Sequence, residues 1–319
     1  MCRTTLLTLL VWVLVSTTST VGLGQTSETN PLFKEAKVKN YLPHMSWKEV
    51  EEALERTDMV IIPVGSIEQH GKHLPLGTDT YGAIEASKLI AQKTDVLVAP
   101  AVFAGLSEHH MGFPGTLTLR PETFEAVVFD AATSLIHHGF TKIMIYNGHG
   151  GNTTSVANVI QKINQTTPAT AVFLNDLALS EEEDPEPPIP YDWHAGEGET
   201  SYMLYMTPSL VDMSQAEKPV LTFPPIVDKI QESGERNLGL VQWANLFRPK
   251  ATGKKASSRE MSNIGVFTSG DPNNATVERG RESTERMVQA AFDFIEAWRK
   301  TGPSGSSSGT THLPPAKQR

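Results

Sequence analysis

Two carboxylates and one imidazole follow the apolar run Met59 to Val64 closely along the chain. Glu68 and His70 are two residues apart, so in an extended segment their side chains project to the same side. A turn at Pro75 to Gly77 lets Asp79 return toward them. These residues could perform acid–base or metal-ligating chemistry, although an exposed polar loop explains this segment equally well when it is taken alone.

A second candidate is the segment Asn147 to Asn152, in which glycines surround His149. Glycine lets the backbone approach a ligand closely, and a plain turn does not explain a histidine at the centre. The segment has neither the G-x-G-x-x-G of a dinucleotide-binding fingerprint nor the Gly-Lys-Ser/Thr of a phosphate loop. The pattern therefore favours an imidazole presented to a ligand at the edge of a sheet.

Two further segments add histidines and carboxylates. Glu197 and Glu199 lie where a helix is expected to begin, and acidic residues in a first turn commonly stabilise a helix. That explanation does not account for His194, just before them. His109 and His110 follow the second apolar run, and surface imidazoles beside a turn explain them at least as well as a functional role.

Together, these segments offer nitrogen and oxygen ligands but no thiolate, because the only cysteine is Cys2. Imidazoles combined with carboxylates suit Zn²⁺, Mn²⁺ or Fe²⁺. One carboxylate could bridge two such ions about 3.5 to 4 Å apart, the usual spacing for activating water. The sequence thus predicts a divalent metal centre built from loops that are distant along the chain.

The elements that must position these residues alternate between strands and helices. Nearly continuous apolar runs, typical of parallel strands buried on both faces, are found at residues 59–64, 96–100, 142–146 and 170–174. Helical spacing runs from Pro121 to Ile136 and from Met287 to Trp298. This order predicts a single-domain α/β layered fold, with a mainly parallel β-sheet flanked by helices and ligands at the carboxyl ends of its strands.

The charge balance excludes one class of partner. The 319 residues include 27 Lys and Arg against 36 Asp and Glu, a formal charge of −9. Nucleic-acid binding draws its affinity from clustered basic side chains, and the sequence has no such run. We therefore expect no nucleic-acid partner.

The two ends of the chain differ from the rest. Residues 1–24 combine Arg3, the apolar run Leu6 to Val15 and a stretch of small residues. This is typical of a cleaved signal peptide, whereas a membrane anchor would need roughly 20 apolar residues. We expect an exported protein, periplasmic or secreted, with no stable membrane anchor after cleavage. Residues 25–39 would form an N-terminal extension, 40–300 the folded domain, and the Gly/Ser/Pro-rich 301–319 a disordered tail.

Between residues 40 and 300, the sequence resembles the creatininase (creatinine amidohydrolase) family. The similar segments, in the family's order, are Pro63–Gly71, Leu74–Thr80, Phe113–Thr116, Asn147–Asn152, His194–Gly196, Glu199–Ser201 and Gly270–Pro272. The resemblance implies an α/β hydrolase of cyclic or linear amides, commonly a homohexamer. It also implies a two-metal centre at the carboxyl end of a parallel sheet, holding Zn or Mn, with Fe as a further option.

The resemblance assigns ligands residue by residue. It implies that Glu68, Asp79 and His149 bind one ion, and that His70 and the shared Asp79 bind the other.

The loop after Asn147 departs from creatininase itself, which has a glutamate two residues after the histidine where this chain has Gly151. Members with this variant draw the missing carboxylate from the Glu-Thr-Ser motif. That assigns Glu199, with Glu197 as the second choice.

The resemblance implies hydrolysis of a C–N bond by water or hydroxide activated by two divalent metals, in which His194 protonates the departing nitrogen. Glu197 is a further candidate catalytic residue, and His110 and Trp193 are candidate substrate-binding residues. Gly151 points away from creatinine and toward the family's formamide hydrolases or its peptidase of modified peptides. The alternative is an exported, non-catalytic protein that binds metal or a small amide with the same residues.

Overall fold

The computed structural model describes residues 35–175, 191–223, 226, 229 and 257–301. Contacts divide the chain into residues 1–37 and 38–319, and the description below concerns the second unit. The predicted signal peptide, most of the predicted extension and nearly all of the predicted tail lie outside the described residues.

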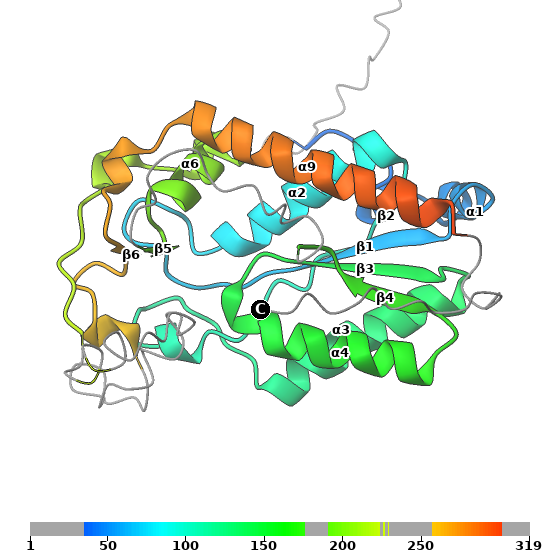
Figure 1. The fold of residues 1–319 in the computed structure, drawn as a ribbon, viewed down its shortest axis with the longest axis horizontal. Coiled ribbons are helices and arrows are strands. Elements are labelled where there is room, and N and C mark those ends of the chain that lie inside the picture. The colour runs from blue at the N-terminus through cyan, green and yellow to red at the C-terminus, as the bar shows by residue number, and fades with distance from the viewer. Residues whose placement is uncertain (1–34, 176–190, 224–225, 227–228, 230–256, 302–319) are drawn as a thin grey trace, which may run out of the picture. The chain divides into compact units, whose positions relative to one another are not determined.

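A four-stranded parallel sheet forms the centre of this unit (Figure 1). Its order is β2 (Leu97–Val98), β1 (Met59–Val64), β3 (Lys142–Asn147), β4 (Thr170–Phe173). β1 and β3 pair along their whole length, from Met59 opposite Lys142 to Val64 opposite Asn147. All four predicted strands are confirmed. β2 is shorter than the apolar run that predicted it, although the Ala99 N–H still donates to the Ile61 carbonyl of β1.

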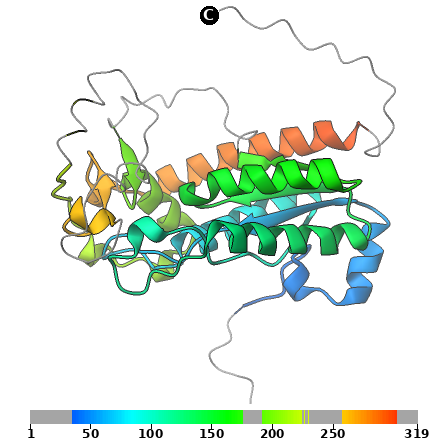
Figure 2. The same ribbon diagram turned by 90° about the horizontal axis from the view of Figure 1, so that it is seen from below.

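Helices cover both faces of the sheet (Figures 1 and 2). α2 (Thr78–Thr94) and α9 (Val277–Arg299) lie on one face, and α3 (Pro121–His137) and α4 (Thr153–Thr166) on the other. β1 shows why: Ile62 packs in the cluster that contains α3 and α4 residues, whereas its neighbour Ile61 packs with α2 and α9. The prediction of an α/β fold with a mainly parallel sheet is confirmed.

The remaining helices are α1 (Trp47–Leu54), α6 (Glu197–Met206) and short 3-10 turns. The turns are η1 (Leu42–His44), η2 (Glu108–His110), η3 (Gly150–Asn152), η4 (Pro208–Leu210), η5 (Met213–Gln215), η6 (Ser258–Glu260) and η7 (Pro272–Asn274). A small antiparallel pair, β5 (Asp192–His194) with β6 (Phe267–Thr268), stands apart from the main sheet.

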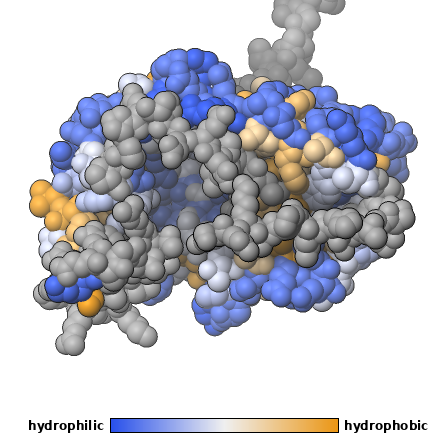
Figure 3. All heavy atoms as spheres, in the orientation of Figure 1, coloured by the Kyte–Doolittle hydropathy of each residue, from blue (hydrophilic) through white to orange (hydrophobic). Residues whose placement is uncertain are grey.

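The outward-facing sides of the helices that cover the sheet are mainly hydrophilic. Figure 3 shows mainly hydrophilic residues on the outer surfaces of α9 and α4, the sides that face away from the sheet. Among the described residues, no helix combines the length and apolarity that a membrane span requires.

Candidate metal centre

The loops that follow β1 and β3 meet at the N-terminus of α2. The loop after β1 carries Glu68 and His70, the first turn of α2 carries Asp79, and His149 follows β3. The loop after β3 approaches α2 closely: a Cβ on Gly148 would lie 2.3 Å from the backbone oxygen of Asp79. Glycine is therefore required at this position, as expected for a loop that approaches its neighbour closely.

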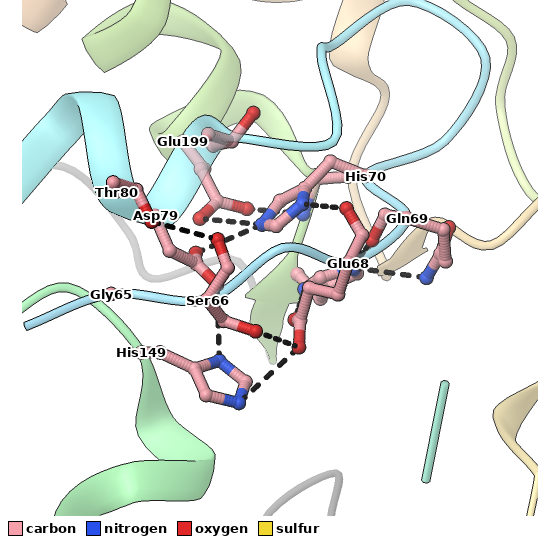
Figure 4. Close-up of polar contacts among 12 residues, drawn as sticks. Gly65, Ser66, Glu68, Gln69, His70, Asp79, Thr80, His149 and Glu199 are labelled. Carbon is pink, nitrogen blue, oxygen red and sulfur yellow. Dashed lines mark hydrogen bonds and ion pairs between the residues drawn. The ribbon is translucent and has the colours of Figure 1, made fainter. Parts of the chain in front are cut away.

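Asp79 lies between two imidazoles (Figure 4). Its Oδ1 is 3.0 Å from Nε2 of His70, and its Oδ2 is 3.1 Å from Nδ1 of His149. The opposite nitrogen of each ring faces a backbone carbonyl: His70 Nδ1 lies 3.1 Å from Glu68 O, and His149 Nε2 lies 3.2 Å from Leu106 O. Carbonyls only accept, so each outer nitrogen carries a hydrogen. The inner nitrogen, which faces Asp79, carries a second hydrogen when the ring is protonated and can bind a cation when the ring is neutral.

A buried carboxylate must be paired or coordinate a metal. The positive charge beside Asp79 is that of protonated His70 and His149 without a metal, and a bound cation would take its place. Backbone carbonyls that hold the outer nitrogens of metal-ligating histidines are the usual arrangement around a metal ion. The geometry around Asp79 thus fits one carboxylate shared between two cation positions.

Glu68 is fully buried and lies among histidines as well. Its Oε2 is 3.2 Å from His149 Nε2, and its Oε1 is 3.4 Å from His110 Nε2 and 3.7 Å from His194 Nδ1. Within the described residues, neither Glu68 Oε1 nor Asp79 Oδ2 has a hydrogen-bond partner, and both are buried. Unpartnered carboxylate oxygens in an imidazole-rich setting are donors that suit a divalent cation.

Glu199 joins the same cluster from α6. Its Oε1 is 3.4 Å from His70 Nε2, while its Oε2 accepts a 2.6 Å hydrogen bond from the Ala195 N–H. Ala195 adopts a left-handed backbone, with φ of 50°, and this turn begins α6. Glu197 is placed differently, because its carboxylate pairs with Arg279 of α9. Residues two apart on a helix point in different directions, which separates these two acids.

His194 reaches the cluster from β5. Its Nε2 lies 2.6 Å from the carbonyl oxygen of Gln69, and its ring lies 4.2 Å from that of His70. Its neighbour Trp193 stacks on Tyr191 at 4.6 Å. The register of β5 against β6 is irregular between Asp192 and His194, so the contacts place these two neighbours: His194 lies against His70, and Trp193 against Tyr191.

His110 lies inside the cluster rather than on an open wall. The side chain is completely buried, its Nδ1 lies 2.6 Å from Ser258 Oγ, and its ring stacks on His194 at 4.4 Å. Gln69 also contacts it, through Nε2 at 3.1 Å from Nδ1. Neither Gln69 nor Ser258 was predicted. Gln69 could have been suspected from its place between Glu68 and His70, whereas nothing in the sequence around Ser258 signals its role.

Burial and neighbouring charges shift the protonation of the cluster. Burial raises the pKa of Glu68 to about 7, although the charge of His149 lowers it. Burial disfavours the charged ring of His149, but the charges of Glu68 and Asp79 outweigh it and raise its pKa to about 9. Burial lowers the pKa of His194 to about 3, helped by the charge of His70. Burial and the charge of His149 lower the pKa of His109 to about 3.

Three overlapping sets of side chains place one ligand atom each within 4.8 Å of the others. They are Glu68 with His109 and His149, Glu68 with His70 and His194, and His70 with Asp79 and Glu199. We call Glu68, His70, Asp79, His149 and Glu199 the donor cluster. The structure thus brings all five predicted ligands together, adds His194 beside them, and directs Glu197 elsewhere.

Comparison with known proteins assigns the family. The sequence model of the creatininase family, described as creatinine amidohydrolase, matches residues 43–295. The chain belongs to the creatininase family. The resemblance inferred from the motifs is thereby confirmed, and so, at the level of the family, is hydrolysis of carbon–nitrogen bonds.

Several curated members of the creatininase family are similar in sequence. A mycofactocin precursor peptide peptidase of Mycolicibacterium smegmatis is 29% identical over 75% of this chain and 85% of its own. The creatinine amidohydrolase of Pseudomonas putida is 30% identical over 58% of this chain and 79% of its own. A 3-dehydro-scyllo-inosose hydrolase of Thermotoga maritima is 31% identical over 55% of this chain. The aligned region spans 59% of that hydrolase, less than two thirds of its length.

Solved creatininase structures share the fold. A structure named "Creatininase Mn" has a TM-score of 0.64 at 23% identity, covering 82% of this chain and 98% of its own. A mutant creatininase of "Zn-Zn type" has a TM-score of 0.62 at 23% identity, covering 83% and 99%. The layered α/β architecture is therefore that of the creatininase fold.

Proposed function

We propose that this member of the creatininase family is a metal-dependent amidohydrolase that hydrolyses the C–N bond of a cyclic or linear amide. The observation that carries the proposal is the position of Asp79, whose two oxygens each face the inner nitrogen of a different histidine. Family membership supplies the reaction class, and the buried, unpartnered oxygens of Glu68 and Asp79 supply the reason for cations.

The donor cluster divides into two positions around Asp79. Glu68, Asp79 and His149 would hold one ion, and His70, Asp79 and Glu199 the other. We favour Zn or Mn, with Fe as a further option, because the donors are imidazoles and carboxylates. When bound, such ions polarise the amide carbonyl and make a water molecule nucleophilic at neutral pH. Glu199 is preferred to Glu197 because the carboxylate of Glu197 is engaged by Arg279.

His194 is the proposed proton carrier. Its Nε2 holds a hydrogen against the Gln69 carbonyl, which leaves Nδ1 free of hydrogen on the side of Glu68. As water adds to the amide carbon, Nδ1 takes up the proton that water loses. The same proton then passes to the amide nitrogen as the C–N bond breaks, so that the amine leaves neutral. Transfer of this kind contributes typically about 10² to 10⁴-fold to a rate.

The substrate class and the setting of the protein are also part of the proposal. The relatives act on creatinine, on a precursor peptide and on 3-dehydro-scyllo-inosose by their names, and a small-molecule amide fits the first of these. Gly151, where creatininase has a glutamate ligand, argues against creatinine itself. We further propose an exported homo-oligomer, a hexamer by likeness to the family, on the basis of the N-terminal signal pattern and the family resemblance.

A hydrolysis screen tests the proposal. The purified protein is assayed with lactams, hydantoins, creatinine and formamides, with and without a chelator. We expect turnover of at least one amide that the chelator abolishes. No turnover across the panel, together with tight retention of metal, would favour the non-catalytic binding protein instead.

Two variants then separate binding from chemistry. His149→Ala should lose metal and activity together, because it removes an inner imidazole of the cluster. His194→Gln should keep its metal content, measured by elemental analysis, and lose turnover. Full activity in either variant would refute the assigned roles.

A further inference from the structure

His109 is a buried histidine for which the proposed reaction has no use. It lies in η2 with its side chain almost fully enclosed, at 4% exposure. Its ring is nearly parallel to that of His149, at an interplanar angle of 6° and a centroid distance of 5.8 Å. No residue in the described part of the chain forms a hydrogen bond with either ring nitrogen of His109. An imidazole that forms no hydrogen bond with the described residues keeps a ring nitrogen available for a ligand from outside the chain.

The surroundings of His109 indicate what that ligand is. One of its ring nitrogens lies within 4.8 Å of ligand atoms from both Glu68 and His149. Two imidazoles and a carboxylate that converge in this way are a typical protein site for zinc. The neighbouring His110 is placed differently: its Nδ1 faces Ser258 and Gln69, and its Nε2 lies 3.4 Å from Glu68 Oε1. Of these two adjacent histidines, His109 is the one that forms a ligand set with Glu68 and His149 among the described residues.

We propose that His109 is an additional metal ligand, which binds the ion held by Glu68 and His149 and makes that position selective for zinc over manganese. This inference rests on the metal centre of the proposed function. It adds a ligand that the family motifs did not assign.

The two positions would then differ in chemistry. One would have the imidazoles of His109 and His149 with Glu68 and the shared Asp79, whereas the other would have the single imidazole of His70 with Asp79 and Glu199. Imidazole favours zinc and iron, and carboxylate is better suited to manganese; divalent zinc also binds nitrogen and oxygen sites more tightly than manganese does. The first zinc equivalent should therefore enter the position that contains His109, while manganese has little preference for it.

The test compares His109→Gln with the wild type and with His73→Gln as a matched control. His73 is equally buried, at 2% exposure, but bonds to Thr200 and belongs to none of the three ligand sets. Each metal-free protein is titrated with Zn²⁺ and, separately, with Mn²⁺ by calorimetry. We expect the affinity of His109→Gln for one of the two zinc ions to fall by more than about 100-fold, and its affinity for the other to stay unchanged. Loss of a residue that only hydrogen-bonds to a metal ligand costs less than this. Manganese binding should change by much less.

The outcomes are distinct. Zinc binding by His109→Gln that equals that of the wild type and of His73→Gln would overturn the inference, as would an equal loss of zinc and manganese. If His109→Gln does not fold, X-ray absorption of the wild type with one equivalent of zinc decides: two imidazoles per zinc support the inference and one overturns it. A wild type that binds no zinc would overturn both this inference and the proposed metal centre. If the zinc affinities change as expected but the protein hydrolyses no amide, only the proposed function is overturned.

Discussion

The interior of the sheet and the carboxyl ends of its strands bury side chains for opposite reasons. Ile62 and Ile145, paired across β1 and β3, are completely buried among other apolar residues, and removal from water itself stabilises them. Glu68 and His149 follow the same two strands and are nearly as buried, at 0% and 6% exposure. Here burial is a cost, because charged and polar groups lose their hydration.

This contrast indicates that the two regions are stabilised by different agents. The apolar side chains of the interior are stabilised by their packing against one another. The donor cluster holds carboxylate oxygens that nothing in the described residues hydrogen-bonds, and the proposed cations would supply the charge that balances them. Changes to the interior should therefore lower stability without altering metal binding. Changes to the donor cluster should alter metal binding and, with it, only the part of the stability that bound metal supplies.

The substitution with the largest expected effect on the donor cluster is Asp79→Asn. The substitution keeps the shape of the side chain but removes the charge that both proposed ions share. We expect loss of both ions by elemental analysis and a fall in hydrolysis of more than about 100-fold. Mutation of a residue that only hydrogen-bonds to a metal ligand costs up to about 100-fold, and loss of a ligand should cost more.

The same variant separates the contribution of metal from that of packing. A ligand present at 100 times its Kd stabilises a folded protein by about 2.7 kcal/mol. Chelation should therefore lower the melting temperature of the wild type and leave that of Asp79→Asn unchanged. An equal response of both proteins to the chelator would contradict the role of Asp79.

The reciprocal test is Ile145→Ala in the middle of β3. This side chain is completely buried, so its truncation leaves a cavity and should cost about 2 to 5 kcal/mol of unfolding free energy. Urea denaturation measures the loss, and Ile145→Val, expected to cost about 0.5 to 1.5 kcal/mol, provides the graded control. Metal content per folded molecule should stay at the wild-type value. A variant that loses metal in proportion to its stability would show that the two regions are not separable.

The sequence could predict the interior because its signal is local. The bounds of β1, Met59–Val64, coincide with the apolar run that predicted it, and β3 extends one residue beyond its run. A strand of continuous apolar residues has two apolar faces, and both are buried when the strand lies between two layers of helices. The donor cluster was also predictable in part, because ligand-type residues in glycine-containing loops stand out wherever those loops lie in the chain.

What could not be predicted depends on contacts between distant segments. Ser258 reaches His110 across 148 positions of sequence, and no local pattern indicates which serine does so. The settings of the adjacent histidines 109 and 110 could not be predicted either, although His110 alone was named as a candidate substrate-binding residue. Both were equally compatible with a surface turn, yet both are buried, and only the arrangement of their neighbours distinguishes them.

The smallest expected effect comes from a choice that the sequence left open, that between Glu197 and Glu199. Glu197 pairs with Arg279, whose side chain is 35% exposed, and an ion pair of this kind contributes about 0.2 to 1 kcal/mol. Glu197→Gln should therefore lower stability slightly by urea denaturation and retain both ions. Glu199→Gln, the matched isosteric change two residues along α6, should lose one ion and most activity. If instead Glu197→Gln lost the ion, the carboxylate paired with Arg279 would have to be released to bind metal, and helix α6 would need a different arrangement when the site is filled.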